Sequence, residues 1–402
     1  MKENIRSQFP IFKNHPHLIY FDSAATTLKP RRVIRAIVNY YEKLGANVHR
    51  GIYQLAEKST IAFEEARQEI ASFINASPQE IIFVRNTSEA INLVVLGFLE
   101  KRLKRGDLIL SSILEHHSNY LPYWQLAKKK GASFLYAPLK ENGRLDLEFL
   151  EKNLQKASFL AITAASNLTG EVPFLEEIIQ KANKLSLPTL LDAAQAAAHL
   201  PLDVKKLPVD FLAFSGHKVY GPTGIGILYV RKEKQKELSP LFFGGEMVIT
   251  VRKNNQPVYN QPPYYFEAGT PAIAEAIGLS EAIKFIKDLG WRTIIDHEQK
   301  LSQYMLEKLL SLKEVKLIGP KTNDSRLAIF SFVIEGIHPH DLAQFLDQYE
   351  IAVRAGQVCA APAVHAFGRE AVVRASLAIY NQKTEIDKFI MVLKEAINFL
   401  KR

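Results

Sequence analysis

The stretch Asp210-Phe211-Leu212-Ala213-Phe214-Ser215-Gly216-His217-Lys218 decides how this chain is interpreted. Its apolar run has strand character and ends in Ser-Gly-His-Lys, which predicts that Lys218 stands at the end of a buried strand. Burial disfavours the charged form of a lysine, so its amine can serve as nucleophile and as base. Schiff-base chemistry needs such an amine. The competing interpretation is a surface lysine after an edge strand, which describes most lysines in a chain that has many.

A second apolar run, Thr189-Leu190-Leu191, ends in Asp192. Pyridoxal 5'-phosphate needs a lysine for its aldehyde and a carboxylate for its pyridinium nitrogen. Lys218 and Asp192 together therefore predict a pyridoxal-phosphate site.

The chain has 402 residues, of which 47% are hydrophobic and 23% charged. This is ordinary globular composition, and the length suits two domains. No apolar run approaches the roughly 20 residues of a membrane span. The start, Met1-Lys2-Glu3-Asn4-Ile5-Arg6, lacks the apolar core of a signal peptide, so we expect a cytoplasmic protein without a membrane partner.

The net charge is +9, but the basic residues are dispersed. The densest cluster, Lys128-Lys129-Lys130, lies at the end of a predicted helix, where cations are favoured. We therefore expect no nucleic-acid partner. Cys359 is the single cysteine, which excludes an intramolecular disulfide and a zinc site with two or four cysteines from one chain. We expect no metal.

Short apolar strands alternate with helices from about Glu80 onward. This pattern predicts an α/β fold with a mainly parallel sheet covered by helices on both faces. Ligands of such sheets bind at the carboxyl ends of the strands, where Asp192 and Lys218 both fall. The strands are predicted at Glu80–Arg85, Asp107–Ser112, Ser133–Ala137, Phe159–Ala164, Thr189–Asp192, Phe211–Ser215 and Gly226–Val230, and the helices at Thr87–Leu103, Tyr120–Lys130, Asp146–Gln155 and Phe174–Leu185.

A smaller α/β unit is predicted after the prolines of Pro257–Pro263 interrupt the pattern. We expect a large domain over residues 20–270 and a small C-terminal domain over residues 271–402, joined by the N-terminal segment 1–19. The second part should contain helices near 272–289, Ile294–Leu310, Pro339–Gln348 and Glu385–Leu400, with strands at Leu327–Val333, Ile351–Arg354 and Val372–Ser376.

Small hydroxyl residues mark a candidate phosphate site. Thr87 and Ser88 lie between a predicted strand and a predicted helix, where backbone and hydroxyl donors can hold an anion. The alternative is a plain helix cap. Ser215 and His217 would add donors from beside Lys218. Gly221–Gly226 precedes a strand and is not a nucleotide-binding loop.

Other polar residues suit the cofactor ring and a substrate. His116 follows a strand and could stack on an aromatic ring, while its adjacent histidine lacks the carboxylate–histidine spacing of a metal site. Asn167 and Gln195 could form hydrogen bonds to the phenolic oxygen of the cofactor. Arg374 interrupts an apolar strand. Its planar guanidinium could bind the α-carboxylate of a substrate with two hydrogen bonds, or it could form a structural ion pair. Cys359 lies in a loop of small residues, Gly and Pro, near Arg354, which can lower a thiol pKa.

Together these residues resemble a cysteine desulfurase of the sulfur-mobilisation (SUF) branch. That branch belongs to the class V aminotransferase family of fold-type I pyridoxal-phosphate enzymes. The resemblance covers nearly the whole chain, and its blocks are Tyr20–Thr27, Ala46–Gly51, Asn86–Asn92, Glu115–Asn119, Asp192–Gln195, Ser215–Lys218, Phe266–Pro271 and Arg374–Asn381.

The resemblance implies a role for each matching residue. Lys218 holds the cofactor covalently and later moves protons, Asp192 pairs with the ring nitrogen, and His116 stacks on the ring. Asn167 and Gln195 contact the ring oxygen. The phosphate is held by Thr87, Ser88, Ser215 and His217. Ala25, Asn167 and Arg374 surround the substrate, L-cysteine, whose sulfur passes to Cys359 and then to an acceptor protein. Thr270 reaches the phosphate of a neighbouring subunit, which implies a homodimer.

One position departs from the family pattern. The usual loop has a histidine directly before the nucleophilic cysteine, whereas this chain has Val358 before Cys359. The short loop resembles the SUF branch. The departure leaves open a selenocysteine lyase, another class V enzyme acting on a small amino acid, or an inactive relative that binds a partner.

Overall fold

The centre of the molecule is a seven-stranded sheet in the order β2–β8–β7–β6–β5–β3–β4. The computed structural model describes residues 5–401. β8 runs antiparallel to both of its neighbours, and the remaining pairs of the sheet are parallel. The strands are β2 (Ile81–Val84), β3 (Leu108–Ser112), β4 (Ser133–Ala137), β5 (Phe159–Thr163), β6 (Thr189–Asp192), β7 (Phe211–Ser215) and β8 (Gly226–Val230).

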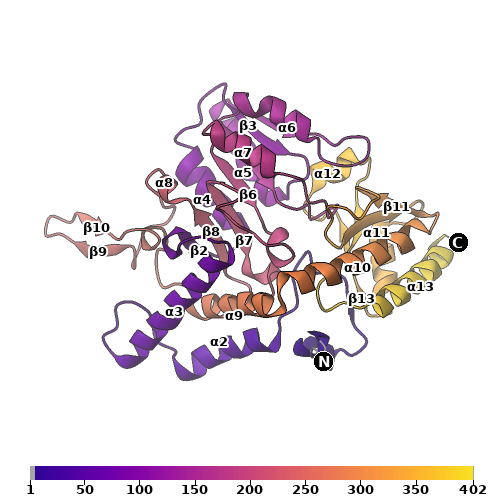
Figure 1. Cartoon of the computed structure of the whole chain (residues 1–402), viewed down its shortest axis with the longest axis horizontal. Helices are drawn as coiled ribbons and strands as arrows, with labels where there is room; N and C mark the ends of the chain where they lie inside the picture. Colours follow the sequence, from indigo (N-terminus) through magenta and orange to yellow (C-terminus); the bar gives the residue numbers. More distant parts are fainter. Residues whose placement is uncertain (1–4, 402) are drawn as a thin grey trace.

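Helices cover both faces of this sheet because successive strand residues point to opposite sides. Leu190 packs into a core with α4 and α5, whereas its neighbour Leu191 packs into a core with α3, α6, α7 and α9. Helices α2, α3 and α9 lie together along the lower edge of Figure 1. The helices are α2 (Arg31–Lys43), α3 (Gln54–Phe73), α4 (Thr87–Val94, continued by a π-helical turn Val95–Leu99), α5 (His117–Lys130), α6 (Leu147–Asn153), α7 (Glu176–Lys184) and α9 (Ile273–Leu289).

A second, antiparallel sheet lies beside the first, in the order β11–β12–β15–β14. Its strands are β11 (Val315–Ile318), β12 (Ile329–Ile334), β14 (Arg354–Gly356) and β15 (Val372–Ser376). Apolar residues of β12 and β15 share a core with α10 (Trp291–Leu310), α11 (Pro339–Asp347) and α13 (Lys383–Leu400). β1 (Ile19–Tyr20) pairs in parallel with β13 (Ile351–Ala352), which ties the N-terminal part to this region.

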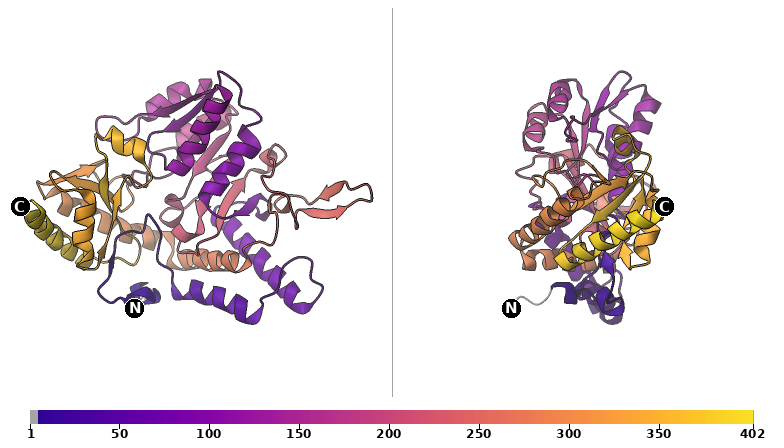
Figure 2. Two further views of the ribbon diagram at one scale, coloured as in Figure 1. Left: turned by 180° about the vertical axis from the view of Figure 1, so that it is seen from behind. Right: turned by 90° about the vertical axis from the view of Figure 1, so that its right-hand side faces the viewer.

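A hairpin of β9 (Val248–Val251) and β10 (Pro257–Tyr259) projects from the body (Figure 1; Figure 2). The short helices are α1 (Ile11–Asn14), α8 (Lys232–Gln235) and α12 (Ala361–Ala366). Sequence reasoning missed this hairpin, because its exposed residues lack the apolar alternation of a half-buried strand.

The predicted alternation of strands and helices is confirmed, and most boundaries agree within two or three residues. The single strand predicted over Ile351–Arg354 is wrong, because the chain changes partners at Val353: β13 pairs with β1, and β14 with β15. β11 and α12 were not predicted. The division at residues 270 and 271 stays a prediction; residues 1–4 of segment 1–19, and residue 402, lie outside the described residues.

Among residues 5–401, no helix has the length and apolar composition needed to cross a membrane. In the same range, the side chains of His, Cys, Asp and Glu do not form a group of three or more that could hold a metal ion.

Candidate active site

A cavity of about 320 Å³ opens where the strands of the large sheet end. It joins the carboxyl ends of β6 and β7 to loops from the smaller sheet. Every site residue predicted from the sequence except Thr270 lines it, namely Ala25, Thr87, Ser88, His116, Asn167, Asp192, Gln195, Ser215, His217, Lys218, Cys359 and Arg374. The fold thus brings together residues that are more than 300 positions apart in the sequence, from Ala25 to Arg374.

Lys218 stands directly after β7, on the 3₁₀ turn Gly216–Lys218. Burial lowers the pKa of its ammonium to about 8, assisted by the nearby Arg374 and opposed by the carboxylate of Asp192. An appreciable fraction of this amine is therefore neutral near physiological pH, as a nucleophile and base requires.

Two carboxyl groups in this region are buried, Asp192 in the lining of the cavity and Glu115 outside it. Asp192 ends β6 with only 3% of its surface exposed, and its Oδ1 accepts a hydrogen bond from the Ala194 N–H at 2.9 Å. Burial raises the pKa of Asp192, against the effects of that hydrogen bond and of Lys218. Glu115 is 1% exposed, and burial raises its pKa to about 8. Sequence reasoning gave Glu115 no role, because an acidic residue before two histidines is not distinctive.

The side of the cavity formed by the first turn of α4 is rich in hydroxyl groups. The Thr87 N–H donates to Ser215 Oγ at 2.9 Å, and the two hydroxyls lie 2.7 Å apart. Ser88 Oγ lies 2.6 Å from Ser118 Oγ. The start of β8 packs very closely here, since a Cβ on Gly226 would lie 2.7 Å from the Asn86 Cα. These donors surround the positive end of a helix dipole, an arrangement that suits an anion.

Burial disfavours the charged form of the imidazole rings near the cavity. His116 precedes α5, and its Nδ1 accepts a hydrogen bond from the Ser118 N–H at 3.1 Å. Burial, together with Lys218, lowers the pKa of His116 to about 3. Burial and the neighbouring lysines, Lys218 and Lys29, lower the pKa of His217 to about 4.

Two side-chain amides are already tied to backbone carbonyls. Gln195 Nε2 donates to the Ala24 carbonyl at 2.8 Å, and Asn167 Nδ2 donates to the Val358 carbonyl at 2.7 Å. The buried Oδ1 of Asn167 has no hydrogen-bond partner within residues 5–401. Asn167 thus keeps an acceptor inside the cavity.

Arg374 lies on β15 and is 2% exposed. Its guanidinium donates to the Asn167 carbonyl at 3.0 Å and to Asp22 at the long distance of 3.4 Å. Arg354 lies closer to the same carboxylate: its Nη2 donates to Asp22 Oδ2 at 2.5 Å, and its Nε donates to Asp22 Oδ1 at 3.1 Å. Arg374 Nε is buried without a partner among the described residues, so this arginine retains capacity for a carboxylate ligand. Asp22 was missed from the sequence, where it is one acid in an N-terminal block.

The Cys359 thiol is exposed at the mouth of the cavity, between β14 and α12. Its backbone carbonyl accepts a hydrogen bond from the His117 N–H at 2.8 Å. The preceding Val358, where the family pattern has histidine, is 8% exposed. The loop therefore buries its valine and presents its cysteine.

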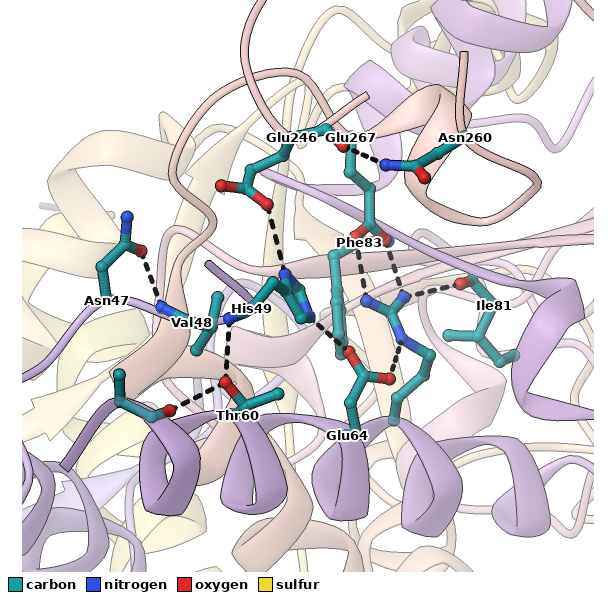
Figure 3. Close-up of polar contacts among 12 residues, drawn as sticks. Asn47, Val48, His49, Thr60, Glu64, Ile81, Phe83, Glu246, Asn260 and Glu267 are labelled. Atoms are coloured by element: carbon teal, nitrogen blue, oxygen red, sulfur yellow. Dashed lines mark hydrogen bonds and ion pairs between the residues drawn. The ribbon is translucent and has the colours of Figure 1, made fainter. Parts of the chain in front are cut away.

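Thr270 lines a separate cavity of about 410 Å³ with Glu89, Phe242 and Phe266. Its segment is anchored through Glu267, whose carboxylate accepts from the Arg67 guanidinium at 2.7 and 2.9 Å and from the Phe83 N–H at 2.7 Å (Figure 3). Arg67 is 1% exposed, so this is a buried, bidentate ion pair.

His49 links the base of the projecting hairpin to α3. Its two ring nitrogens lie 2.9 Å from a carboxylate oxygen of Glu64 and 3.3 Å from one of Glu246 (Figure 3). These acids raise the pKa of His49, chiefly through the hydrogen bond to Glu64. Glu246 lies two residues before β9, so the imidazole holds the start of the hairpin.

The mainly parallel sheet, the lysine and the aspartate at its strand ends, and the thiol at the mouth of the same cavity define an enzyme of the α/β class. The model of the class V aminotransferase family matches residues 19–389, and the chain belongs to this family. Members of the family depend on pyridoxal phosphate in general.

Known relatives agree with this assignment over the full length. A probable cysteine desulfurase of Streptomyces coelicolor is 42% identical, with 99% of this chain and 97% of the relative covered. A probable cysteine desulfurase of Pyrococcus abyssi is 41% identical, with 99% of this chain and 98% of the relative covered. The apo structure of a cysteine desulfurase from Thermococcus onnurineus has a TM-score of 0.95 at 40% identity, with 99% and 98% covered. The structure of the cysteine desulfurase CsdA of Escherichia coli has a TM-score of 0.90 at 34% identity, with 98% of each chain covered. The predicted family and the predicted fold-type I architecture are confirmed.

Proposed function

We propose that this protein is a pyridoxal-phosphate-dependent cysteine desulfurase that converts L-cysteine to L-alanine and carries the sulfur on Cys359 as a persulfide. The observation that carries the proposal is that Lys218, Asp192, Arg374 and the exposed thiol of Cys359 line one cavity. Relatives at about 40% identity over almost the whole chain bear the same name.

The residues of the cavity suit the cofactor. A pyridinium N–H would give the buried carboxylate of Asp192 the cationic partner that a buried charge requires. Thr87, Ser88, Ser215 and His217, which line the cavity around the first turn of α4, would hold the phosphate. The ring of His116 would stack on the pyridine ring, and Lys218 would form the covalent link. When bound, pyridoxal phosphate supplies an aldehyde and an electron-withdrawing ring.

Each remaining residue has a task toward the substrate. Arg374 binds the α-carboxylate through the donors that Asp22 leaves weakly used. Lys218 removes and returns the proton at the α-carbon, for which its lowered pKa provides the neutral amine. Asp192 would keep the ring nitrogen of the cofactor protonated. Cys359 Sγ attacks the substrate sulfur from the mouth of the cavity.

The overall reaction balances without another redox partner. The carbon–sulfur bond of L-cysteine breaks, and a sulfur–sulfur bond forms at Cys359. The β-carbon gains a hydrogen and becomes the methyl group of L-alanine. The carbon is reduced while the sulfur is oxidised to the persulfide level, so no external oxidant is consumed.

Two variants test these assignments separately. Cys359→Ser should abolish production of sulfide and persulfide from L-cysteine while the cofactor still binds. Lys218→Ala should lose the covalent cofactor, measured by borohydride reduction and mass analysis of the peptide that carries residue 218. Full sulfur production by Cys359→Ser would remove Cys359 from the mechanism, and a covalent cofactor in Lys218→Ala would refute the site.

The assembly is proposed to be a cytoplasmic homodimer of the SUF branch that supplies sulfur to an acceptor protein, for iron–sulfur cluster assembly or related sulfur trafficking. The position of Thr270 outside the cavity of its own chain supports a contribution to the neighbouring subunit. Light scattering should give the mass of two chains, and a monomer that is fully active would exclude this arrangement.

Val358 is the observation that favours a second candidate, a selenocysteine lyase or another class V enzyme for a small amino acid. A substrate panel scored by alanine release separates it from a desulfurase. Release from L-selenocysteine but not from L-cysteine would decide for the lyase.

A further inference from the structure

The loop that carries Cys359 turns through two successive left-handed residues. Val358 has a φ of 45° and Cys359 a φ of 56°. A β-branched residue rarely adopts positive φ, because its side chain crowds the backbone. Such a conformation persists where contacts from the surrounding structure impose it. The position of the thiol therefore depends on what holds this turn from outside.

His117 holds the C-terminal side of the turn through two hydrogen bonds. Its backbone N–H donates to the Cys359 carbonyl at 2.8 Å, and its ring Nε2 accepts from the Ala361 N–H at 3.1 Å. The Val358 carbonyl receives a third contact from Asn167. His117 thus makes two of these three contacts, and nothing in the sequence motifs assigned it a role.

The start of α5, which carries His117, is anchored to the large sheet. His117 opens α5 two residues after Glu115, whose buried carboxyl group accepts from Ser112 Oγ at 2.5 Å, from the Thr163 N–H at 3.0 Å and from Asn119 Nδ2 at 2.6 Å. These bonds join the ends of β3 and β5 to the first turn of α5. The contact to the cysteine loop therefore extends from the core of the large sheet.

The contact from Ala361 fixes the state of the His117 ring. Because Nε2 accepts a hydrogen bond, it carries no proton, and the ring hydrogen is on Nδ1. Burial lowers the pKa of His117, which agrees with a neutral ring. Ala361 is the first residue of α12, so the same bond also fixes the helix that follows the cysteine.

We infer that His117 is a positioning residue for the sulfur-transfer step: it holds the left-handed turn so that the Cys359 thiol faces the cavity containing Lys218. This inference rests on the proposed function of Cys359. It requires His117 to affect the sulfur step more than the binding of L-cysteine, because neither of its hydrogen bonds to the loop involves Arg374.

The first measurement uses substrate-free protein. His117→Phe keeps a planar ring but removes the acceptor, whereas His117→Gln places an amide oxygen near the position of Nε2. Hydrogen exchange of the peptide over residues 355–361 should be about 3–10-fold faster in His117→Phe, the factor expected for one hydrogen bond, and within about twofold of native in His117→Gln. His338→Phe is the matched control, since His338 Nδ1 also accepts a backbone N–H, from His340 at 3.3 Å.

The second measurement follows sulfur uptake by Cys359. The rate should fall by about 3–10-fold in His117→Phe with KM for L-cysteine unchanged, and His117→Gln should restore it. If His117→Phe does not fold, His117→Asn replaces it, because its shorter side chain does not reach Ala361.

Native exchange in the variant without the acceptor would overturn the inference, and so would faster exchange with undiminished sulfur uptake. Failure of the proposed function is distinguishable: the wild-type protein would then take up no sulfur, while the exchange data would still decide whether His117 holds the turn.

Discussion

The end of strand β7 and the loop of Cys359 face the same cavity but are built in opposite ways. Lys218 follows a strand whose five residues are all buried, and a regular sheet fixes its position. Cys359 is exposed and sits in a left-handed turn that a few contacts from distant residues hold in place. The first region is rigid by secondary structure, and the second by tertiary contacts.

The two modes of support suit the two roles that we propose for Lys218 and Cys359. In the proposed mechanism, the amine that binds the cofactor stands at the end of a sheet strand, where burial also lowers its pKa. The thiol that we propose receives the sulfur is exposed, where an acceptor protein could reach it. Variants at the strand ends should therefore affect cofactor chemistry, and variants around the turn should affect sulfur transfer.

The largest effect is expected for Asp192→Asn. A neutral amide cannot keep the ring nitrogen protonated, so alanine release should fall by about 10²–10⁴-fold while the cofactor still binds. Steady-state assays of the holoenzyme measure this loss. Hydrogen exchange in the cysteine loop should stay native, and a loosened loop would show that the two regions are not independent.

A smaller loss is expected for Ser215→Ala, at the end of β7. The variant removes one hydroxyl from the phosphate side and leaves the Thr87 N–H without its acceptor. Cofactor affinity should weaken by about 10–100-fold, as for a lost hydrogen bond to a charged group. Fluorescence titration of the apo protein measures it, with Ser311→Ala on the exposed end of α10 as control. Unchanged affinity would remove Ser215 from the phosphate site.

The rate of cofactor attachment to the apo protein should depend on pH through Lys218. Only the neutral amine attacks the aldehyde, and burial lowers its pKa from 10.5 to about 8. Attachment should speed up about tenfold per pH unit below about pH 7 and level off above about pH 8. Stopped-flow absorbance follows it. A rate that continues to rise toward pH 10 would show an ordinary, solvated lysine.

Asn167→Ala should loosen the turn from its other side. The variant loses the bond to the Val358 carbonyl but keeps the backbone carbonyl that Arg374 contacts. Exchange over residues 355–361 should become about 3–10-fold faster. Asn153→Ala is the control, since its amide also donates to a backbone carbonyl, of Phe149. Equal exchange in both variants would contradict the view that tertiary contacts hold the turn.

The smallest effect concerns stability at the strand ends. The pKa of Glu115 is about 8 in the folded protein and 4.5 as its ordinary value, so the folded state holds this proton more tightly. Its contribution to stability is complete below about pH 4.5 and is lost as the pH rises toward 8. Between about pH 5 and about pH 8.5, wild-type Tm should fall by about 2–4 °C relative to Glu115→Gln. If the Tm of the wild-type protein and the Tm of Glu115→Gln changed equally with pH, the carboxyl group of Glu115 would be ionised over this range in the folded protein, and the prediction would be wrong.

The sequence predicted the strand-end region far better than the turn. Apolar runs that end in Asp192 and Lys218 combine a local pattern with a chemical requirement. Thr87, His116 and Arg374 were candidates from their places at strand ends or within a strand, and the family resemblance gave each of them a role. Asp22 and His117 were not identified, because their roles arise from contacts with residues more than 200 positions away. The hairpin β9–β10 was missed because it packs little and so leaves no apolar periodicity.

The most direct test of the central claim is mass spectrometry of the native protein after incubation with L-cysteine. The peptide that carries Cys359 should gain the mass of one sulfur atom, and a reducing agent should remove it. Release of alanine without any added mass on Cys359 would contradict the account.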